Sequence, residues 1–348
     1  MKLSDFDYEL PPGRIAQEPP DQREGARLMY LNRKTGAVEH LRFPQILDLL
    51  EAGDVLVLND TRVIPAKLFG TRQSTGGKVE ALLVQPQDDN HWHALLKTRG
   101  KLQDGETILF GEGKLVANVA GRHAGDGWRI RFQMPKDELL TELTKYGVMP
   151  LPPYIKRQGE SDPRVEFDRE RYQTIFAREP GAIAAPTAGL HFTDSLLERI
   201  RRDGIEIVSV TLHVGLGTFK PVAAEDPRRH QMHAERYTLS DETASAINRA
   251  KDEHRRIIAV GTTACRTLES CASECRLQPA SGWTSLFIYP LYEFQVIDGL
   301  ITNFHLPRST LLMLVAAFAG RERILNAYQE AITEEYRFYS YGDAMVIL

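Results

Sequence analysis

Apolar and polar stretches alternate most clearly in the middle of the chain. Two short apolar runs, at 183–185 and 207–212, enclose a segment whose apolar residues recur at helical spacing. Thr193 or Asp194 can cap this helix, and Gly204 can end it. Each run is followed by a loop rich in glycine, threonine, histidine and phenylalanine. Because a helical crossover favours a parallel pair of strands, the pattern predicts that both loops leave the same edge of a sheet, where α/β proteins bind ligands.

The same pattern recurs on either side of this stretch. Apolar runs at 55–58, 257–260 and 286–289 are typical of buried strands. Helical spacing recurs at 241–254 and over the long, largely apolar segment 309–332. This alternation of strands with helices predicts an α/β fold with a mostly parallel sheet.

Between residue 63 and about residue 135 the pattern changes, and a helical pattern follows at 137–147. Short apolar segments alternate with glycine- and aspartate-rich turns at spacings of roughly 8 to 12 residues, which is typical of a small β-barrel or sandwich. A stiff, proline-rich segment follows, and the α/β pattern then resumes. We therefore predict a discontinuous α/β domain, residues 1–62 and 150–348, with a small β-barrel domain inserted at 63–149.

The composition is that of a soluble globular protein. The chain has 348 residues, of which 42% are hydrophobic and 26% charged, and this length favours two domains. Its formal net charge of −4 means that nucleic acid would have to bind at a local basic patch. The densest basic cluster of the β-rich region is Lys97, Arg99 and Lys101. A solvated turn and a phosphate contact both explain this cluster.

The cysteines and apolar runs bear on the compartment. Cys265, Cys271 and Cys275 are odd in number and lack C-x-x-C spacing, which favours reduced thiols in a cytoplasm. The acidic N-terminal segment does not resemble a signal peptide, and the longest apolar run, 311–319, is far shorter than the ~20 residues of a membrane span. We expect a cytoplasmic protein without membrane contact.

Four predicted strand-end loops carry polar and titratable side chains. These are Asp60-Thr61-Arg62, Gly189-Leu190-His191-Phe192, His213 with Gly215 and Gly217, and Asn303-Phe304-His305. Histidine is suited to proton transfer near neutral pH, so three histidines at one sheet edge favour an active site. The aromatic neighbours favour a flat ligand such as a purine. The glycine pair is a poor dinucleotide-binding signal, because a third glycine is missing.

Two further features could bind anions. Thr262 and Thr263 open a helix whose amides could receive a carboxylate or phosphate, although a plain threonine cap explains the same spacing. Arg23 and Arg27 lie in the proline-rich N-terminal region, which is either a solvated arm or a pair of cations folded over an anionic ligand.

Several long motifs resemble one family. They are LNDTRVIPAKL, MPLPPYI, RYQTIFA, GAIAAPTAGLHFT, VTLHVGLGTFKPV, GTTACRTLES, LITNFHLPRSTLLML and YRFYSYGDAM. They are similar to motifs of the S-adenosylmethionine:tRNA ribosyltransferase-isomerases of queuosine synthesis, and the resemblance covers nearly the whole chain. One departure is Leu291, where the family usually has glycine, which puts the shape of that loop in question.

The resemblance implies an α/β domain with an inserted β-barrel, in agreement with the pattern above. It implies a monomeric enzyme without a true cofactor or metal, in which S-adenosylmethionine is the co-substrate that donates a ribosyl unit. The implied acceptor is the 7-aminomethyl-7-deazaguanine base at the first anticodon position of certain tRNAs. The implied products are epoxyqueuosine tRNA, adenine and methionine.

This reaction needs proton transfers, because a base removes a C5′ hydrogen next to the sulfonium and an acid protonates the departing adenine. We expect His191, His213 and His305 to be the acid and base candidates, with Asp60 or Glu235 orienting one of them. Phe192 and Phe219 could stack on adenine or on the acceptor base. The methionine carboxylate could bind at Thr262-Thr263 or at Arg62. The remaining substrate-binding candidates are Thr187, Gly189, Gly215, Gly217, Arg266, Asn303 and Tyr341. The tRNA would extend onto the barrel through Lys97, Arg99 and Lys101.

Two other classes of function remain open at this point. His230 and His233, with a third ligand, could hold the metal of a hydrolase. Alternatively, the β-barrel could be the reader of a non-catalytic RNA-binding protein, which would leave the histidine-bearing loops without a role.

Overall fold

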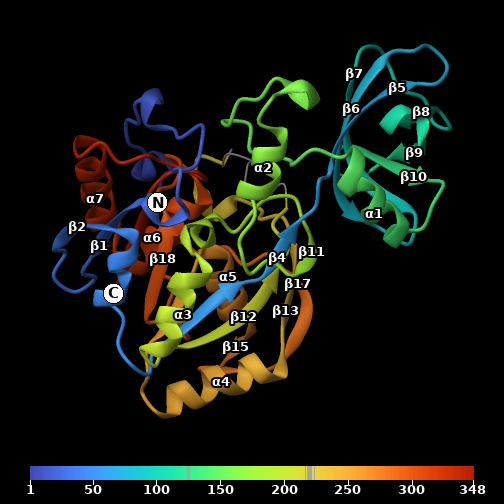
Figure 1. Cartoon of the computed structure of the whole chain (residues 1–348). Coiled ribbons are helices and arrows are strands. Elements are labelled where there is room, and N and C mark those ends of the chain that lie inside the picture. The colour runs from blue at the N-terminus through green and yellow to red at the C-terminus, as the bar shows by residue number, and fades with distance from the viewer. Residues whose placement is uncertain (124–125, 216, 218–221, 223) are drawn as a thin grey trace.

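The computed structural model describes residues 1–348 except 124–125, 216, 218–221 and 223. Two bodies are visible in Figure 1: a large sheet with helices on both faces, and a smaller β-barrel set to one side. The fold class predicted from the sequence is thereby confirmed. The strands of the barrel lie between Lys67 and Phe132, and the exact domain boundaries stay a prediction.

The large sheet has nine strands in the order β17-β13-β12-β3-β14-β18-β19-β1-β2. Their bounds are β1 (Arg27–Leu31), β2 (Val38–Arg42), β3 (Val55–Asn59), β12 (Glu206–Leu212), β13 (Glu235–Leu239), β14 (Ile257–Val260), β17 (Ala280–Thr284), β18 (Gly299–Asn303) and β19 (Ala344–Ile347). The central strands β12, β3, β14 and β18 are parallel to one another. Strand β19 is antiparallel to β18 and parallel to β1, so the C-terminal tail closes the gap between the two.

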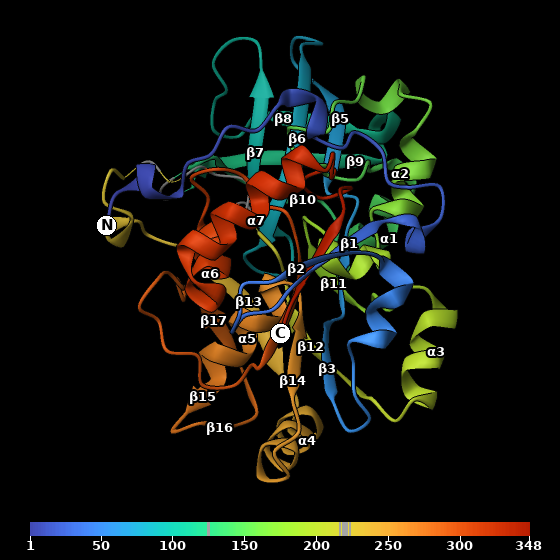
Figure 2. The same ribbon diagram turned by 90° about the vertical axis from the view of Figure 1, so that its left-hand side faces the viewer.

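Alternate residues of the buried strands pack into two separate hydrophobic cores, one on each face of the sheet. In β3, Val55 and Val57 face a core shared with helices α4 to α7, whereas Leu56 and Leu58 face a core shared with α3. Figure 2 shows α6 and α7 on one side of the sheet and α3 on the other. The helices are α3 (Asp194–Arg202), α4 (Asp241–Asp252), α5 (Thr262–Cys271), α6 (Thr310–Ala319) and α7 (Arg321–Thr333). The long segment 309–332 is thus two helices, because Gly320 adopts φ 92° between them.

The barrel is a closed ring of six antiparallel strands in the order β10-β7-β6-β5-β8-β9. The bounds are β5 (Lys67–Arg72), β6 (Lys78–Pro86), β7 (His91–Thr98), β8 (Thr107–Phe110), β9 (Leu115–Arg122) and β10 (Trp128–Phe132), and helix α1 (Lys136–Tyr146) packs beside it. Its core is filled by side chains such as Leu68, Val79, Trp92, Ile108 and Ile130. Closure removes the unpaired strand edges that an open sheet of this size would expose.

Short elements connect the two bodies. Strand β4 (Thr61–Val63) continues from β3 and pairs with β11 (Glu179–Ala182) in a two-stranded ribbon, and helix α2 (Val165–Arg171) precedes β11 in the chain. A second small ribbon joins β15 (Ala272–Ser273) to β16 (Arg276–Leu277).

Two strand predictions are wrong. The run 183–185 follows β11 but belongs to no strand of the large sheet, and the run 286–289 is irregular chain after β17. Both runs contribute buried side chains, Ile183 and Ile288 among them. A short apolar run predicts burial, which loop residues can also provide, and the hydrogen-bonding partner of a strand is not contained in its own pattern.

The loop that departs from the family pattern has a backbone suited to glycine. Leu291 adopts φ 88° and is 97% exposed. A leucine pays a steric cost there that glycine would avoid. No helix among the described residues is long and apolar enough to cross a membrane.

Candidate active site

The carboxyl ends of the four parallel strands meet at one edge of the sheet, and three of the four predicted loops leave this edge. The prediction is wrong for the loop 189–192, which follows no strand of the large sheet. Asp60 follows β3, His213 follows β12, Thr262 lies just after β14, and His305 lies two residues after β18. Since β12 and β18 are three strand spacings apart, His213 and His305 are separated by roughly 14 Å across the sheet. The histidines therefore share an edge but not one reacting atom.

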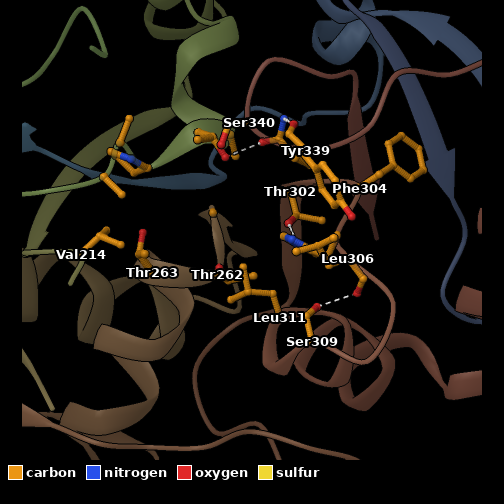
Figure 3. Close-up of a pocket in the computed structure, with 18 of the residues that line it drawn as sticks. Val214, Thr262, Thr263, Thr302, Phe304, Leu306, Ser309, Leu311, Tyr339 and Ser340 are labelled. Carbon is orange, nitrogen blue, oxygen red and sulfur yellow. Dashed lines mark hydrogen bonds between the residues drawn. The ribbon is translucent and has the colours of Figure 1, made fainter. Parts of the chain in front are cut away.

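A small cavity of about 80 Å³ lies at the ends of β14 and β18. Figure 3 shows Thr262 and Thr263, at the start of α5, and Thr302, on β18, approaching it from neighbouring elements, with Tyr339 and Ser340 across from them. Its wall also includes Thr187, Asn303 and His305, three of the predicted site residues. The first amides of α5 have no partner within the helix, so this end of α5 favours an anionic group.

His305 is fixed on several sides in this wall. Its Nε2 lies 2.7 Å from Thr302 Oγ1, its backbone N–H donates to Tyr328 Oη at 3.1 Å, and its carbonyl accepts a hydrogen bond from Tyr8 Oη. Burial lowers the pKa of His305 to about 3. At neutral pH it is therefore a neutral imidazole, able to accept a proton or to donate through one ring nitrogen.

His191 lies behind this cavity and does not line it. Its Nε2 is 3.3 Å from Asn303 Nδ2, and its ring packs on Phe43 with centroids 5.0 Å apart. Burial, with smaller contributions from Arg337 and Arg23, lowers the pKa of His191 to about 3. Asn303 also accepts a hydrogen bond from Thr187 Oγ1 at 3.1 Å. His191 thus contacts the wall of the cavity through Asn303 and does not reach the cavity itself.

A larger cavity of about 610 Å³ lies between the barrel and the ends of β12 and β13. Its lining comes from both bodies: Val84, Gln85, Pro86, Trp92, His93, His123, Asp126, Lys136, Leu140, Pro180, Gly181, His213, Val214, Gly215, His233, Ala234, Glu235, Arg236 and Trp283. We call it the interdomain cavity. Val214 lines this cavity and the small one, so the two adjoin.

His213 is the predicted histidine that this cavity exposes. Its Nδ1 lies 2.8 Å from Thr61 Oγ1, and its other ring nitrogen has no hydrogen-bond partner among the described residues. Gly181 lies against the ring, because a Cβ there would be 2.9 Å from His213 Cε1. Burial, reinforced by Arg236, lowers the pKa of His213 to about 4. His213 is therefore neutral at pH 7, held in orientation by Thr61, and open to a ligand.

A buried ion pair lies under the same cavity. Glu235 Oε2 pairs with Arg266 Nη1, and Glu235 Oε1 accepts a hydrogen bond from the backbone N–H of Gly215 at 2.9 Å. The two side chains are only 3% and 5% exposed. Arg266 Nη2 is buried without a hydrogen-bond partner in the described part of the chain. Glu235 and Arg266 thus fix the loop after β12.

The barrel supplies lining residues that the sequence analysis missed. The rings of His93 and His123 are stacked with centroids 3.8 Å apart, and His93 Nε2 lies 2.7 Å from the carbonyl oxygen of Asp126. Trp283, on β17, is 52% exposed at the opposite wall. An exposed tryptophan and a stacked ring pair are surfaces on which a nucleobase can stack. The turn composition of 122–127 carries no signal for this, because the ring pair forms only when the barrel closes.

Asp60 is buried away from both cavities. It accepts a hydrogen bond from Thr211 Oγ1 at 2.6 Å and pairs with Arg178 at 2.8 Å. Burial raises the pKa of Asp60, and Thr211 and Arg178 oppose that shift. None of these contacts reaches a histidine. Nothing in its position therefore supports the expectation that Asp60 orients one of them.

Other predicted residues are packed into the interior. Phe192 is fully buried against Phe43 and Phe176, and Tyr341 donates a hydrogen bond to Asp168 at 3.1 Å in a buried position. A Cβ at Gly189 would lie 2.7 Å from Phe176, so this glycine permits close packing. These positions do not support the stacking and binding roles we expected. An aromatic residue or a glycine in the sequence does not show whether its position lies in a core or in a pocket.

The last predicted positions lie elsewhere. Arg62 lines a third cavity, and Gly217 packs against His233. Phe219 lies outside the described residues. Lys97, Arg99 and Lys101 are exposed at the end of β7 opposite to His93, about 20 Å along the strand from the interdomain cavity.

The metal-site alternative has little geometric support. Among the described residues, no group of three or more histidine, cysteine, aspartate or glutamate side chains is arranged to hold a metal ion. The ring of His230 packs edge-on against Phe287 with centroids 5.6 Å apart, and Glu235 is engaged with Arg266 and Gly215.

Comparison with known proteins agrees with this geometry. Residues 3–347 match the model of a family described as queuosine biosynthesis protein. The chain belongs to that family. It is 53% identical over 352 residues, covering all of both chains, to the S-adenosylmethionine:tRNA ribosyltransferase-isomerase of Desulfitobacterium hafniense. The crystal structure of the S-adenosylmethionine tRNA ribosyltransferase of Thermotoga maritima is also similar, with 38% identity, a TM-score of 0.57, and coverage of 99% of this chain and 100% of that one.

Proposed function

We propose that this protein transfers and isomerises the ribosyl unit of S-adenosylmethionine onto the 7-aminomethyl-7-deazaguanine base at the first anticodon position of tRNA. Family membership and the full-length similarity to a named ribosyltransferase-isomerase support the reaction class. The two cavities that adjoin at Val214 are the observation that carries the proposal. Such a reaction must bring a nucleoside and a nucleobase together, and each cavity offers a suitable environment for one of them.

The small cavity suits the amino-acid part of S-adenosylmethionine. It is lined by hydroxyls and an amide, and faced by the start of α5. The free amides there can receive the methionine carboxylate without a cation in the wall. The predicted carboxylate site at Thr262-Thr263 therefore fits the geometry better than the one at Arg62, which lines a different cavity.

The interdomain cavity suits the acceptor base. Its volume of about 610 Å³ admits a nucleotide, and Trp283 and the His93–His123 pair offer stacking surfaces on two walls. Because the cavity lies between the two bodies, a tRNA loop can enter it without passing through the sheet. Partial desolvation of the aminomethyl group in this cavity would favour the neutral amine that must attack the sugar.

His213 is placed to move protons where the two cavities meet. With its pKa lowered to about 4, it is neutral at pH 7 and can accept the C5′ hydrogen acidified by the sulfonium. The imidazolium that forms can then return the proton to the departing adenine. His305, on the other side of Val214, is the second candidate for either step.

The reaction class is tested by incubating the protein with S-adenosylmethionine and tRNA carrying the modified base, and measuring free adenine. We expect adenine release that depends on the aminomethyl group, with none from tRNA bearing guanine at that position. Release of S-adenosylhomocysteine, or no reaction with the modified tRNA, would contradict the proposal.

A further inference from the structure

A third cavity, of about 500 Å³, lies between α1, α2 and the β4–β11 ribbon. It shares Leu140 and Pro180 with the interdomain cavity, so the two adjoin along the seam between the barrel and the sheet. Three arginines line it: Arg23, Arg62 and Arg169. We call it the arginine cavity.

Two of these arginines are held in place by neutral acceptors. Arg23 donates to the carbonyl oxygens of Leu190 at 3.3 Å and Glu170 at 3.0 Å. Arg169 donates to those of Thr144 at 2.6 Å and Gly147 at 3.0 Å, and its Nε is 3.4 Å from the exposed carboxylate of Glu166. Carbonyl groups orient a guanidinium without cancelling its charge. Of the described residues that line the cavity, only Glu170 carries a carboxylate.

Arg62 is the arginine whose guanidinium remains available. Within the described residues its side chain makes no hydrogen bond or ion pair. Strand alternation places Thr61 and Arg62 on opposite faces of β4: Thr61 bonds to His213 at the interdomain cavity, and Arg62 faces the arginine cavity. Arg62 is paired in register with Pro180, one of the two residues common to both cavities.

The surroundings carry a surplus of positive charge. Arg171, beside Arg23, also donates to carbonyl oxygens, those of Asp21 at 3.0 Å and Pro20 at 2.5 Å. Burial and the neighbouring Arg171 lower the pKa of Arg23. A bound anion would relieve this repulsion, and the planar fork of an arginine matches the oxygens of a phosphate.

We propose that the arginine cavity binds a backbone phosphate of the tRNA next to the nucleotide whose base enters the interdomain cavity. The inference rests on the proposed function. Every nucleotide is flanked by phosphates. If the tRNA places a base on one side of the β4–β11 ribbon, a neighbouring phosphate of the same RNA chain therefore lies near Pro180, at the edge of the arginine cavity. Arg62 is then a binding residue for the tRNA backbone and not for the methionine carboxylate.

The test compares Arg62→Ala with Arg202→Ala, an exposed arginine on α3 whose side chain also makes no hydrogen bond or ion pair in the described structure. Binding of the modified tRNA is measured by fluorescence anisotropy over a range of salt concentrations, and the KM for S-adenosylmethionine is measured separately. Loss of one charge-assisted phosphate contact should weaken tRNA binding about tenfold. It should also reduce the slope of log K against log salt by about 0.7 to 0.9.

We expect Arg202→Ala to bind tRNA like the wild type, and both variants to keep the wild-type KM for S-adenosylmethionine. Arg62→Lys should restore the salt slope but only part of the affinity, since lysine keeps the charge and loses the fork. An Arg62→Ala variant that raises the KM for S-adenosylmethionine and leaves the tRNA salt slope unchanged would overturn the inference in favour of a carboxylate site. Equal behaviour of Arg62→Ala and Arg202→Ala would overturn it as well. Failure of the wild type to release adenine would instead contradict the proposed function.

Discussion

The small cavity and the interdomain cavity differ in how they are built. The small one is formed by neighbouring strand ends of one sheet, and its histidine is fixed by hydrogen bonds to Thr302 and Tyr328. The interdomain cavity is formed by segments from two bodies, and His213 is held there through one ring nitrogen. Under the proposed function, the donor would bind where neighbouring strand ends of one sheet meet, and the acceptor would bind at the seam between the barrel and the sheet. The difference teaches that two substrates of different size can be received by two differently built parts of one fold.

Removing His213 is expected to have the largest effect. His213→Ala should lower the rate of adenine release by about 10² to 10⁴, the range for loss of an acid or base, while tRNA and S-adenosylmethionine still bind. His40→Ala is a matched control, because His40 lies near the surface with Glu330 and lines none of the three cavities. Single-turnover kinetics would measure both. Wild-type turnover in His213→Ala would mean that chemistry is confined to the small cavity.

Breaking the ion pair under the interdomain cavity ranks next. Glu235→Ala leaves Arg266 as a buried, unpaired cation, and such losses cost about 3 to 5 kcal/mol of stability. Urea unfolding would measure the change. Glu235→Gln keeps an acceptor for Gly215 and should lose less. If Glu235→Ala unfolds like the wild type, the seam is not held by this pair.

A pH series separates the two kinds of histidine. The pKa values of His191 and His305 fall from 6.5 to about 3 on folding, so between these values the unfolded chain binds more protons. Stability should therefore fall as the pH drops below about 6.5. Protonation of His213 should lower turnover only as the pH nears 4. Denaturation should show stability falling below about pH 6.5, and rate measurements should show turnover falling near pH 4. Because the pKa of His213 is also lowered on folding, the pH dependence of stability should be smaller in His213→Ala than in the wild type.

The smallest effect is expected at the far end of the barrel. Reversing the charges of Lys97, Arg99 and Lys101 should weaken tRNA binding and lower its salt dependence, with no change in affinity for S-adenosylmethionine. Because this loop is about 20 Å from the interdomain cavity, the loss should be smaller than for Arg62→Ala. An unchanged salt slope would limit the tRNA footprint to the seam.

Local sequence patterns predicted many of the helices and strands. Thr193 caps α3 by accepting a hydrogen bond from Leu196 N–H, and Gly204 ends that segment with φ 81°, as their residue types predicted. Continuous apolar runs identified β3 and β14, and the spacing of turns identified the barrel. The strand predictions at 183–185 and 286–289 were wrong because a strand also needs a partner, which a local pattern does not specify.

For the candidate active site, too, some features were predicted from the sequence and others appeared only in the structure. The sequence by itself determined the family, the reaction class, and which residue types stand at the ends of the parallel strands, because these depend on local motifs and on the direction of crossovers. Only the tertiary structure decided that His191 and Phe192 face the core, that His213 faces a seam, and that His93, His123 and Trp283 join it. The physical reason is that burial, pKa and access depend on neighbours distant in the chain, and those neighbours meet only when the barrel and the sheet are both formed.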